Sequence, residues 1–206
     1  MLQFVFIVAL IVFVAAVFWL VLRNASAKIS SQYEQLSKQL GLEHNQPPAK
    51  MGGFLRPEPS LYGEYRGREV SVSVPGKGLQ NTRQVETVLK VEVRNLPFNA
   101  QLTATGPLAG MRQRDSGGLP RWKSGDAAFD GAVDARTDQG EALGDLLDDG
   151  RRIWLAKMLR QSKGTLYIGK NKLVYARLGL IADEKTRREL EAAVEFLCDL
   201  AKTIEA

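Results

Sequence analysis

The chain has 206 residues, with 28 Lys and Arg against 23 Asp and Glu, and a formal net charge of +5. This length allows one membrane segment and one ordinary domain. The single Cys excludes an internal disulfide and suits a reducing compartment, without excluding an oxidising one. The moderate positive excess suits a position beside an anionic membrane surface, but it does not by itself indicate a nucleic-acid-binding protein.

The first segment of the chain predicts a membrane anchor. Residues 2–22 contain no charged residue, Pro or Gly, and Gln3 is their one polar residue. As a helix with about 1.5 Å rise per residue they would span roughly 30 Å, the thickness of a bilayer core. A cleaved signal peptide usually has a basic start and a shorter apolar run, although the small residues at 25–27 would suit cleavage. We therefore interpret residues 1–23 as a retained transmembrane anchor, with cleavage as the alternative.

The flanking charges predict which side of the membrane holds the rest of the chain. Arg23 and Lys28 follow the apolar segment, and no Lys or Arg precedes it. Cytoplasmic flanks of membrane helices carry the excess of Lys and Arg. The flanking charges therefore predict that the soluble domain lies in the cytoplasm.

Residues 24–53 are expected to form a juxtamembrane helix followed by a linker. Apolar residues recur at helical spacing up to Leu40, and Gly41 supplies a C-terminal stop. Pairs of Pro and Gly oppose regular structure in residues 43–53. We expect His44 to be solvated in this linker.

Residues 54–206 are expected to form one soluble α+β domain that begins with strands. Residues 61–74 have the pattern of two short strands joined by a tight turn, and residues 87–93 alternate Val and Leu with Lys and Glu. We expect residues 96–105 to pair antiparallel with residues 87–93.

The second half of the domain is expected to contain the helices. In residues 126–135, apolar residues at every second position alternate with positions that include Asp130 and Asp134. This alternation predicts a strand. Asp138 is expected to cap a following helix, because Glu141 completes the spacing of a capping box. Residues 150–164 continue as a second helix.

The chain is expected to end with a hairpin and a long helix. Residues 165–178 have the hairpin pattern, and residues 184–204 form an amphipathic helix capped by Asp183. About seven strands with short turns predict an antiparallel sheet, with late helices and a packed C-terminal helix on one face.

The order of motifs resembles that of a family of bacterial proteins of unknown function. The motifs are LSKQLGL (36–42), GEYRGREVSV (63–72), TVLKVEV (87–93) and SGDAAFD (124–130), followed by helices, a hairpin and a terminal helix. Members of this family often carry an N-terminal membrane segment, so the resemblance implies a protein of the bacterial inner membrane. The resemblance covers roughly residues 30–205, and it implies no activity and no catalytic residues.

Few residues suit catalysis or metal binding. One Cys and one His, far apart in the sequence, do not suit a zinc site, and His44 lies outside the expected domain. Asp126 and Asp130 could belong to a catalytic or cation site, but the dense oxygen pattern of a calcium loop is missing. We expect Cys198 to be a buried packing residue. The sequence therefore predicts no catalytic residue, no metal and no cofactor.

Charge segregation provides the candidate binding surface. The charged residues within 126–149 are all Asp or Glu except for Arg136, whereas the charged residues within 150–182 are all Lys or Arg. These blocks could simply pair across the fold, or they could present a basic face to an acidic partner or to anionic lipid, with a Trp at the interface. The candidate residues are Arg112, Arg114, Arg121, Trp122, Lys123, Arg151, Arg152, Lys157, Arg160, Lys163, Lys170 and Lys172.

Three functions are compatible with these patterns. The favoured hypothesis is a non-enzymatic accessory protein, anchored by one span, whose domain docks a protein partner at the membrane. The alternative is an anionic-lipid-binding domain that uses residues 151–172. The third is an enzyme with a site near Asp126 and Asp130. Nucleic acid is a weaker partner, because the basic excess is small.

Overall fold

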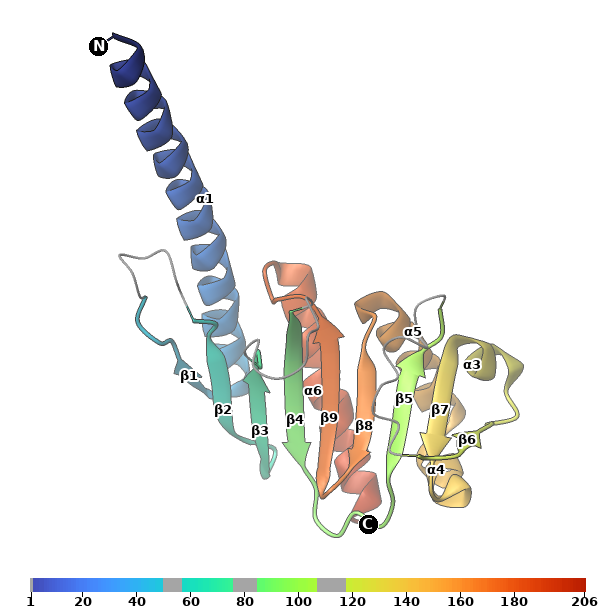
Figure 1. The fold of residues 1–206 in the computed structure, drawn as a ribbon. Coiled ribbons are helices and arrows are strands. Elements are labelled where there is room, and N and C mark those ends of the chain that lie inside the picture. Colours follow the sequence, from blue (N-terminus) through green and yellow to red (C-terminus); the bar gives the residue numbers. More distant parts are fainter. Residues whose placement is uncertain (1, 50–56, 76–84, 107–117) are drawn as a thin grey trace.

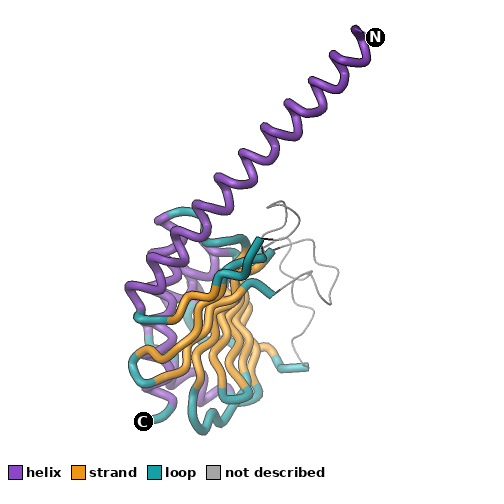
Figure 2. The backbone as a smooth tube through the Cα atoms, turned by 90° about the vertical axis from the view of Figure 1, so that its left-hand side faces the viewer, coloured by secondary structure: helices purple, strands orange, loops and turns teal. Residues whose placement is uncertain are grey.

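The structure is a computed structural model, and it describes residues 2–49, 57–75, 85–106 and 118–206. Within these ranges the strands form one nine-stranded antiparallel sheet in the order β1-β2-β3-β4-β9-β8-β5-β7-β6. Figures 1 and 2 show that the helices cover one face of this sheet. The elements are α1 (Leu2–Leu40), β1 (Glu43–Asn45), β2 (Ser60–Tyr65), β3 (Arg68–Ser73), β4 (Glu86–Glu92), β5 (Ala100–Ala104), β6 (Arg121–Trp122), α3 (Ala127–Ala132), β7 (Val133–Thr137), α4 (Gly140–Leu146), α5 (Asp149–Ser162), β8 (Thr165–Gly169), β9 (Lys172–Leu178) and α6 (Glu184–Ile204).

The predicted fold class is confirmed: an N-terminal long apolar helix precedes an antiparallel sheet with late helices and a packed C-terminal helix. The two predicted hairpins form β2–β3 and β8–β9. The turn between β2 and β3 places Arg66 and Gly67 at positive φ. The sheet has more strands than the sequence predicts, because β1 and β6 are too short to show a period.

Alternating side chains give the sheet one buried face. In β4 the buried residues alternate with more exposed ones, as expected of a strand covered on one side. The strand register then aligns buried side chains in a row across the sheet, and the row consists of Val72, Leu89, Tyr175, Leu166, Leu102 and Ala135.

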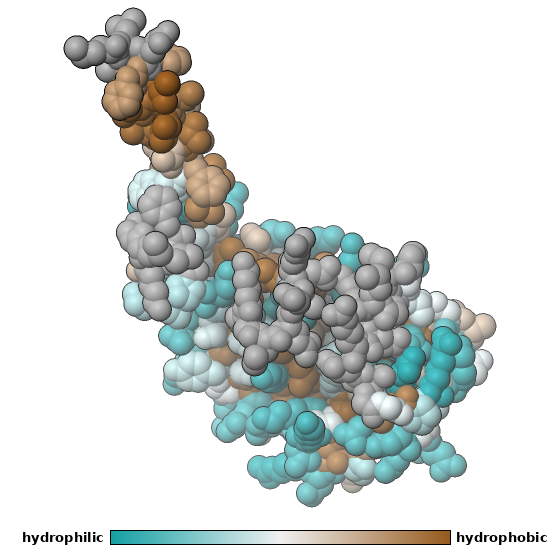
Figure 3. Space-filling model, viewed as in Figure 1, coloured by the Kyte–Doolittle hydropathy of each residue, from teal (hydrophilic) through white to brown (hydrophobic). Residues whose placement is uncertain are grey.

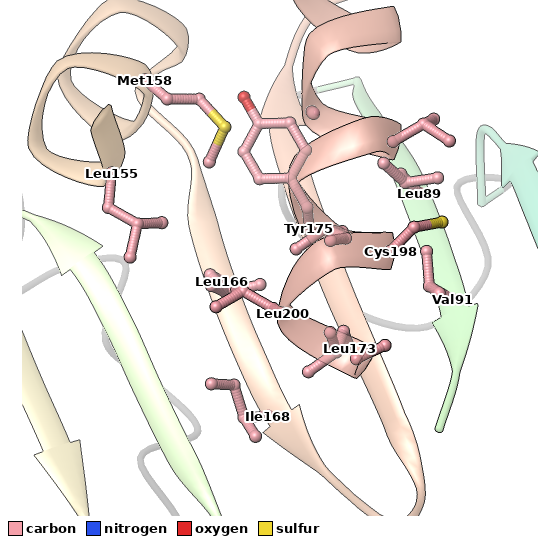
Figure 4. Packing of buried hydrophobic residues seen from close by; sticks show 14 of the residues in the cluster. Leu89, Val91, Leu155, Met158, Leu166, Ile168, Leu173, Tyr175, Cys198 and Leu200 are labelled. Carbon is pink, nitrogen blue, oxygen red and sulfur yellow. The ribbon is translucent and has the colours of Figure 1, made fainter. Parts of the chain in front are cut away.

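Helices α5 and α6 pack on this face (Figure 4). The predicted start of α6 is confirmed: Asp183 accepts a hydrogen bond from the Thr186 backbone N–H at 2.7 Å, and Thr186 completes a capping box. Its apolar stripe, which includes Leu190, Val194 and Leu197, is fully buried. Cys198 is 3% exposed, so the prediction of a packing residue is confirmed. Burial raises the pKa of its thiol.

Helix α1 has two very different halves. Its N-terminal half is exposed and apolar, as the brown surface in Figure 3 shows, and α1 is the one described helix long and apolar enough to cross a membrane. Farther along the same helix, Tyr33, Leu36 and Leu40 are buried in the domain core. The helix ends at Leu40, with Gly41 at φ +66, as predicted. The division of the chain at residues 23 and 53 stays a prediction.

A buried arginine joins α1 to α6. Arg187 is 5% exposed and forms an ion pair with Glu191 on its own helix. Its Nε donates to Gln32 Oε1 at 3.2 Å, and its Nη1 donates to Gln39 Oε1. Gln32 and Gln39 lie two turns apart on α1, so one guanidinium holds both turns against α6. Because a buried charge needs its full set of partners, this contact fixes how α1 sits on the domain.

Two sequence predictions for the sheet are wrong. Residues 127–132 form α3 rather than a strand, because Asp126 accepts from the N–H groups of Ala128 and Phe129 and so starts a helix. β5 pairs with β7 and β8, not with β4, because β9 occupies the edge of β4 that β5 was expected to take.

The linker prediction for His44 is also wrong. His44 lies in β1 and pairs with Leu61 of β2, half-buried rather than solvated. The strand is only three residues long, and a stretch so short shows no period in the sequence.

The C-terminal end of α6 is tied to the strands by a carboxylate. Arg68 donates to both oxygens of Glu205 at 2.7 Å, and the Arg94 backbone N–H donates to the same carboxylate at 2.7 Å. The bond from Arg68 is the main reason that the pKa of Glu205 falls from 4.5 to about 2.

We expect Arg187→Ala to destabilise the domain by about 3 kcal/mol, because it leaves the half-buried Glu191 without its partner and removes the donors to Gln32 and Gln39 of α1. Guanidinium-induced unfolding of the full chain in mild detergent, followed by tryptophan fluorescence, measures the change. The control is Arg188→Ala, which removes an exposed pair with Glu184 and should cost less than about 1 kcal/mol. Equal losses for the two variants would contradict a special role for Arg187.

We expect the stabilising effect of Glu205 to depend on pH. Its pKa is lower in the folded state than in the unfolded chain, so its contribution is complete above pH 4.5 and is lost as the pH falls toward 2. The difference in unfolding free energy between the native chain and Glu205→Gln should therefore shrink over this window. Glu195→Gln, on an exposed position of the same helix, should show no such trend. A constant difference down to pH 2 would refute the role of the Arg68 contact.

Candidate functional site

The acids of SGDAAFD hold their own loop. Asp126 is the N-cap of α3. Asp130 accepts from the Ser124 backbone N–H and from its Oγ, both at 2.9 Å, and from the Gly125 N–H at 3.3 Å. The sequence signal for this arrangement was an Asp followed by Ala-Ala-Phe, a helix start that the period-2 pattern obscured.

The electrostatics of Asp130 do not suit proton transfer at neutral pH. Burial acts to raise the pKa of Asp130, but the hydrogen bonds from Ser124 and Gly125 outweigh it and the pKa lies below its usual value. A general acid or base works best with a pKa near the operating pH. Across residues 2–49, 57–75, 85–106 and 118–206, no three His, Cys, Asp or Glu side chains are grouped so that they could hold a metal. The geometry therefore offers the enzyme hypothesis no support.

Asp138 is not the helix cap that the sequence predicts. The N-cap of α4 is Gln139, which makes no side-chain cap bond. Asp138 instead accepts from the Asn99 backbone N–H and from Asn99 Nδ2, both at 2.8 Å. Both bonds lower the pKa of Asp138, and the bond from Asn99 Nδ2 has the larger effect. The capping-box spacing was met by chance, because Asn99 becomes a neighbour only through the pairing of β5 with β7.

The Trp residues contribute to packing rather than to an open interface. Trp122 lies over α4 so closely that a Cβ added to Gly140 would meet its Cδ1 at 2.9 Å. Trp154 of α5 stacks on Phe196 of α6, with ring centroids 4.0 Å apart. Both side chains are half-buried.

Several predicted basic residues pair with acids close to them. Arg121 Nε lies 2.9 Å from Asp134 Oδ1, and Asp134 is 8% exposed. Arg151 donates to the Leu146 carbonyl at 2.7 Å and to Thr203 Oγ1 at 2.6 Å, which joins α5 to its neighbours. The other pairs are Arg151 with Asp148, Arg152 with Asp149, and Lys172 with Glu92.

The remaining candidates do not form one surface. Arg112 and Arg114 lie outside the described residues. Lys170 lies in the β8–β9 turn and Lys172 begins β9 next to it; Figure 1 shows this turn at the end of the sheet opposite the N-terminal half of α1. Lys123 is exposed just after β6 at the far edge of the sheet, and Lys163 caps the C-terminal end of α5.

One group of side chains on α5 is both exposed and charged. Ile153, Lys157 and Arg160 are spaced by four and three residues and therefore share one face of the helix. Ile153 is 69% exposed, and the two cations are exposed with no hydrogen bond or ion pair to the described residues. We call these three residues the α5 patch. Ile153 was not among the predicted binding residues, although its helical position is out of phase with the buried Leu155, Met158 and Leu159.

Comparisons with known proteins identify a solved structure of similar fold but no family. No family model matches the chain and no curated protein matches it, so the resemblance built on GEYRGR and SGDAAFD stays a prediction. Among solved structures, the fold is similar to the crystal structure of the mycobacterial trehalose monomycolate transport factor A, TtfA. The two share 13% identity with a TM-score of 0.55, over 84% of this chain and 93% of that chain. At this identity the likeness shows a common fold alone.

Proposed function

We propose that the chain is a single-pass membrane-anchored, non-enzymatic accessory protein whose α+β domain docks a protein partner at the membrane. The observation that carries the proposal is the continuity of α1, which passes without a break from its apolar half into the domain core. The solved structure with a similar fold is named a transport factor, which is compatible with an accessory role.

A continuous helix would hold the domain at a fixed height above the bilayer. Tyr33 lies 11 residues beyond Leu22, a rise of about 16 Å along α1. Gln32 and Gln39 are bonded to Arg187, so this segment cannot pivot freely on α6. A domain held in this way presents its sides to other proteins of the same membrane, which is the geometry of an accessory subunit.

The α5 patch is the best-supported docking surface. Figures 1 and 2 show α1 leaving the domain at one end of the sheet, whereas α5 lies in the layer that covers one face. The patch therefore lies on the helix-covered side of the domain rather than at the end where α1 leaves it. An exposed apolar residue beside two cations suits a partner with an acidic rim around an apolar pocket.

The lipid-binding alternative has less support. Its residues 151–172 do not share a face: Arg151 and Arg152 bond to neighbouring groups of the domain, and Lys170 and Lys172 lie at the end of the sheet away from the apolar half of α1. Attraction of a cation to anionic lipid falls off within a Debye length of about 8–10 Å.

We expect a photo-crosslinker placed at Ile153 or Lys157 to capture one membrane protein in cells, and one placed at Lys202 of α6 to capture none. The double change Lys157→Glu and Arg160→Glu should weaken co-purification of that protein at least about tenfold, because it reverses two charges at the contact. Lys202→Glu is the matched control. Crosslinks to lipid alone, or a chain that stays monomeric and alone in mild detergent, would contradict the docking proposal.

We also propose that the anchor lies in the bacterial inner membrane with the domain in the cytoplasm, because Arg23 and Lys28 follow the apolar segment. A green fluorescent protein fused to the C-terminus should fluoresce, and an alkaline phosphatase fused there should be inactive. Replacing Arg23 and Lys28 by Gln while adding Lys residues before Leu2 should shift part of the population to the opposite orientation. An active phosphatase fusion on the native chain would show that the orientation is wrong.

A further inference from the structure

A small pocket lies beside α1 where the helix leaves its apolar segment. It has a volume of about 270 Å³ and is enclosed by α1, residues 46–49 and residues 57–59. Ser26, Ile29 and Ser30 of α1 form one wall, and Gln46, Glu58 and several prolines form the other. None of the binding residues considered above belongs to it.

The end of the pocket nearest the membrane lies at the height of the lipid headgroups. Ser26 and Ser30 lie four and eight residues beyond Leu22, which corresponds to about 6 and 12 Å along a helix. The headgroup region of a bilayer extends roughly 5–8 Å beyond each side of the hydrocarbon core. Since α1 continues without a break through this region, Ser26 would lie within the headgroup layer and Ser30 about 4 Å beyond it, so the nearest abundant ligands of the pocket would be lipid headgroups.

The lining favours an uncharged headgroup that carries hydroxyl groups. Ser30 Oγ donates to Gln46 Oε1 at 3.0 Å, which leaves the Gln46 amide N–H groups and the Ser oxygen lone pairs available for other partners. Glu58 is the one charged residue among the described lining residues, and its carboxylate would accept from hydroxyls and repel a phosphate. Partial burial raises the pKa of the Glu58 carboxyl group. A ligand hydroxyl that donates to this group would replace hydrogen bonds to water that the carboxylate loses on burial.

The walls and the size suit a ring. Ile29 and the prolines present rigid apolar surface, against which the C–H face of a sugar ring can pack. The volume is close to the lower limit of about 300 Å³ for ligand pockets, so it would hold one ring rather than a whole lipid.

We propose that this juxtamembrane pocket binds the uncharged, hydroxyl-bearing headgroup of a membrane lipid, a single sugar ring at the membrane surface. The proposal rests on the membrane anchoring proposed above, and it is independent of the partner and of the α5 patch. It assigns to the protein a lipid selectivity that comes from hydrogen bonds rather than from charge.

The test uses the full chain, purified in a detergent without a sugar headgroup and reconstituted into phosphatidylcholine nanodiscs. The discs contain equal minor fractions of monoglucosyl diacylglycerol and phosphatidylglycerol. Native mass spectrometry of the protein released from the discs then measures which lipid stays bound. We expect the glucolipid to be enriched about fivefold over its share in the disc, the factor that one net hydrogen bond supplies.

Two matched pairs of variants locate the site. Ser26→Phe should fill the pocket and abolish the enrichment, whereas Ala27→Phe, at an exposed neighbouring position, should leave it unchanged. Glu58→Gln should reduce the enrichment, whereas Glu43→Gln, an exposed change in β1 outside the pocket, should not. The second pair keeps the test decisive if Ser26→Phe fails to fold.

The outcomes separate this proposal from the proposed function. A chain that fails to enter the discs would refute the anchor, whereas a chain that enters them without enriching the glucolipid refutes only the pocket. Enrichment of phosphatidylglycerol would overturn the assigned chemistry. Loss of the enrichment in excess methyl glucoside would support recognition of the sugar ring by the pocket, whereas persistence of the enrichment would show that another part of the lipid is bound and would overturn the proposal.

Discussion

The contact between α1 and α6 determines how the whole molecule can act. The last turns of α1 contribute Tyr33, Leu36 and Leu40 to the core, and Arg187 of α6 donates to Gln32 and Gln39. Apolar packing supplies most of the attraction, but the hydrogen bonds fix a single rotational orientation of α1 about its axis. A shift by one residue would turn both glutamines away from the Arg187 guanidinium. The direction of the exposed apolar half therefore follows from the domain core.

Pairing of charges within the domain explains why so little of the basic sequence is free to bind. The acidic and basic blocks adjoin each other in the sequence, and the fold brings Arg121 to Asp134 and Lys172 to Glu92. Such pairs stabilise the domain only slightly where they are exposed. They nevertheless reduce the field that a partner would meet, so the charges of the α5 patch stand out against a largely compensated surface.

Apart from α3, local patterns predicted local structure, and the other failures were mostly contacts between distant segments. The two hairpins and the Asp183 cap depend on residues a few positions apart, and the sequence located all three. The partners of β5 depend instead on where β9 inserts, 70 residues later, which no periodicity encodes. The same holds for the site: helical phase could have revealed Ile153, but the pocket joins Ser30 to Glu58 across β1, and only the folded chain shows it.

Distance from the bilayer, rather than charge, separates the surfaces that could contact lipid from those that could not. The basic composition of residues 151–172 does not place them near lipid. This segment ends at the β8–β9 turn, at the end of the sheet away from the apolar half of α1. Ser26 and Ser30 carry no charge, yet they follow the apolar segment within two or three helical turns of its end. If α1 crosses the membrane, Ser26 and Ser30 lie near the headgroups together with Arg23 and Lys28, and the basic residues of segment 151–172 are left to face proteins. Recognition of lipid would then depend on hydrogen bonds at the base of the anchor, and recognition of protein on the side of the domain.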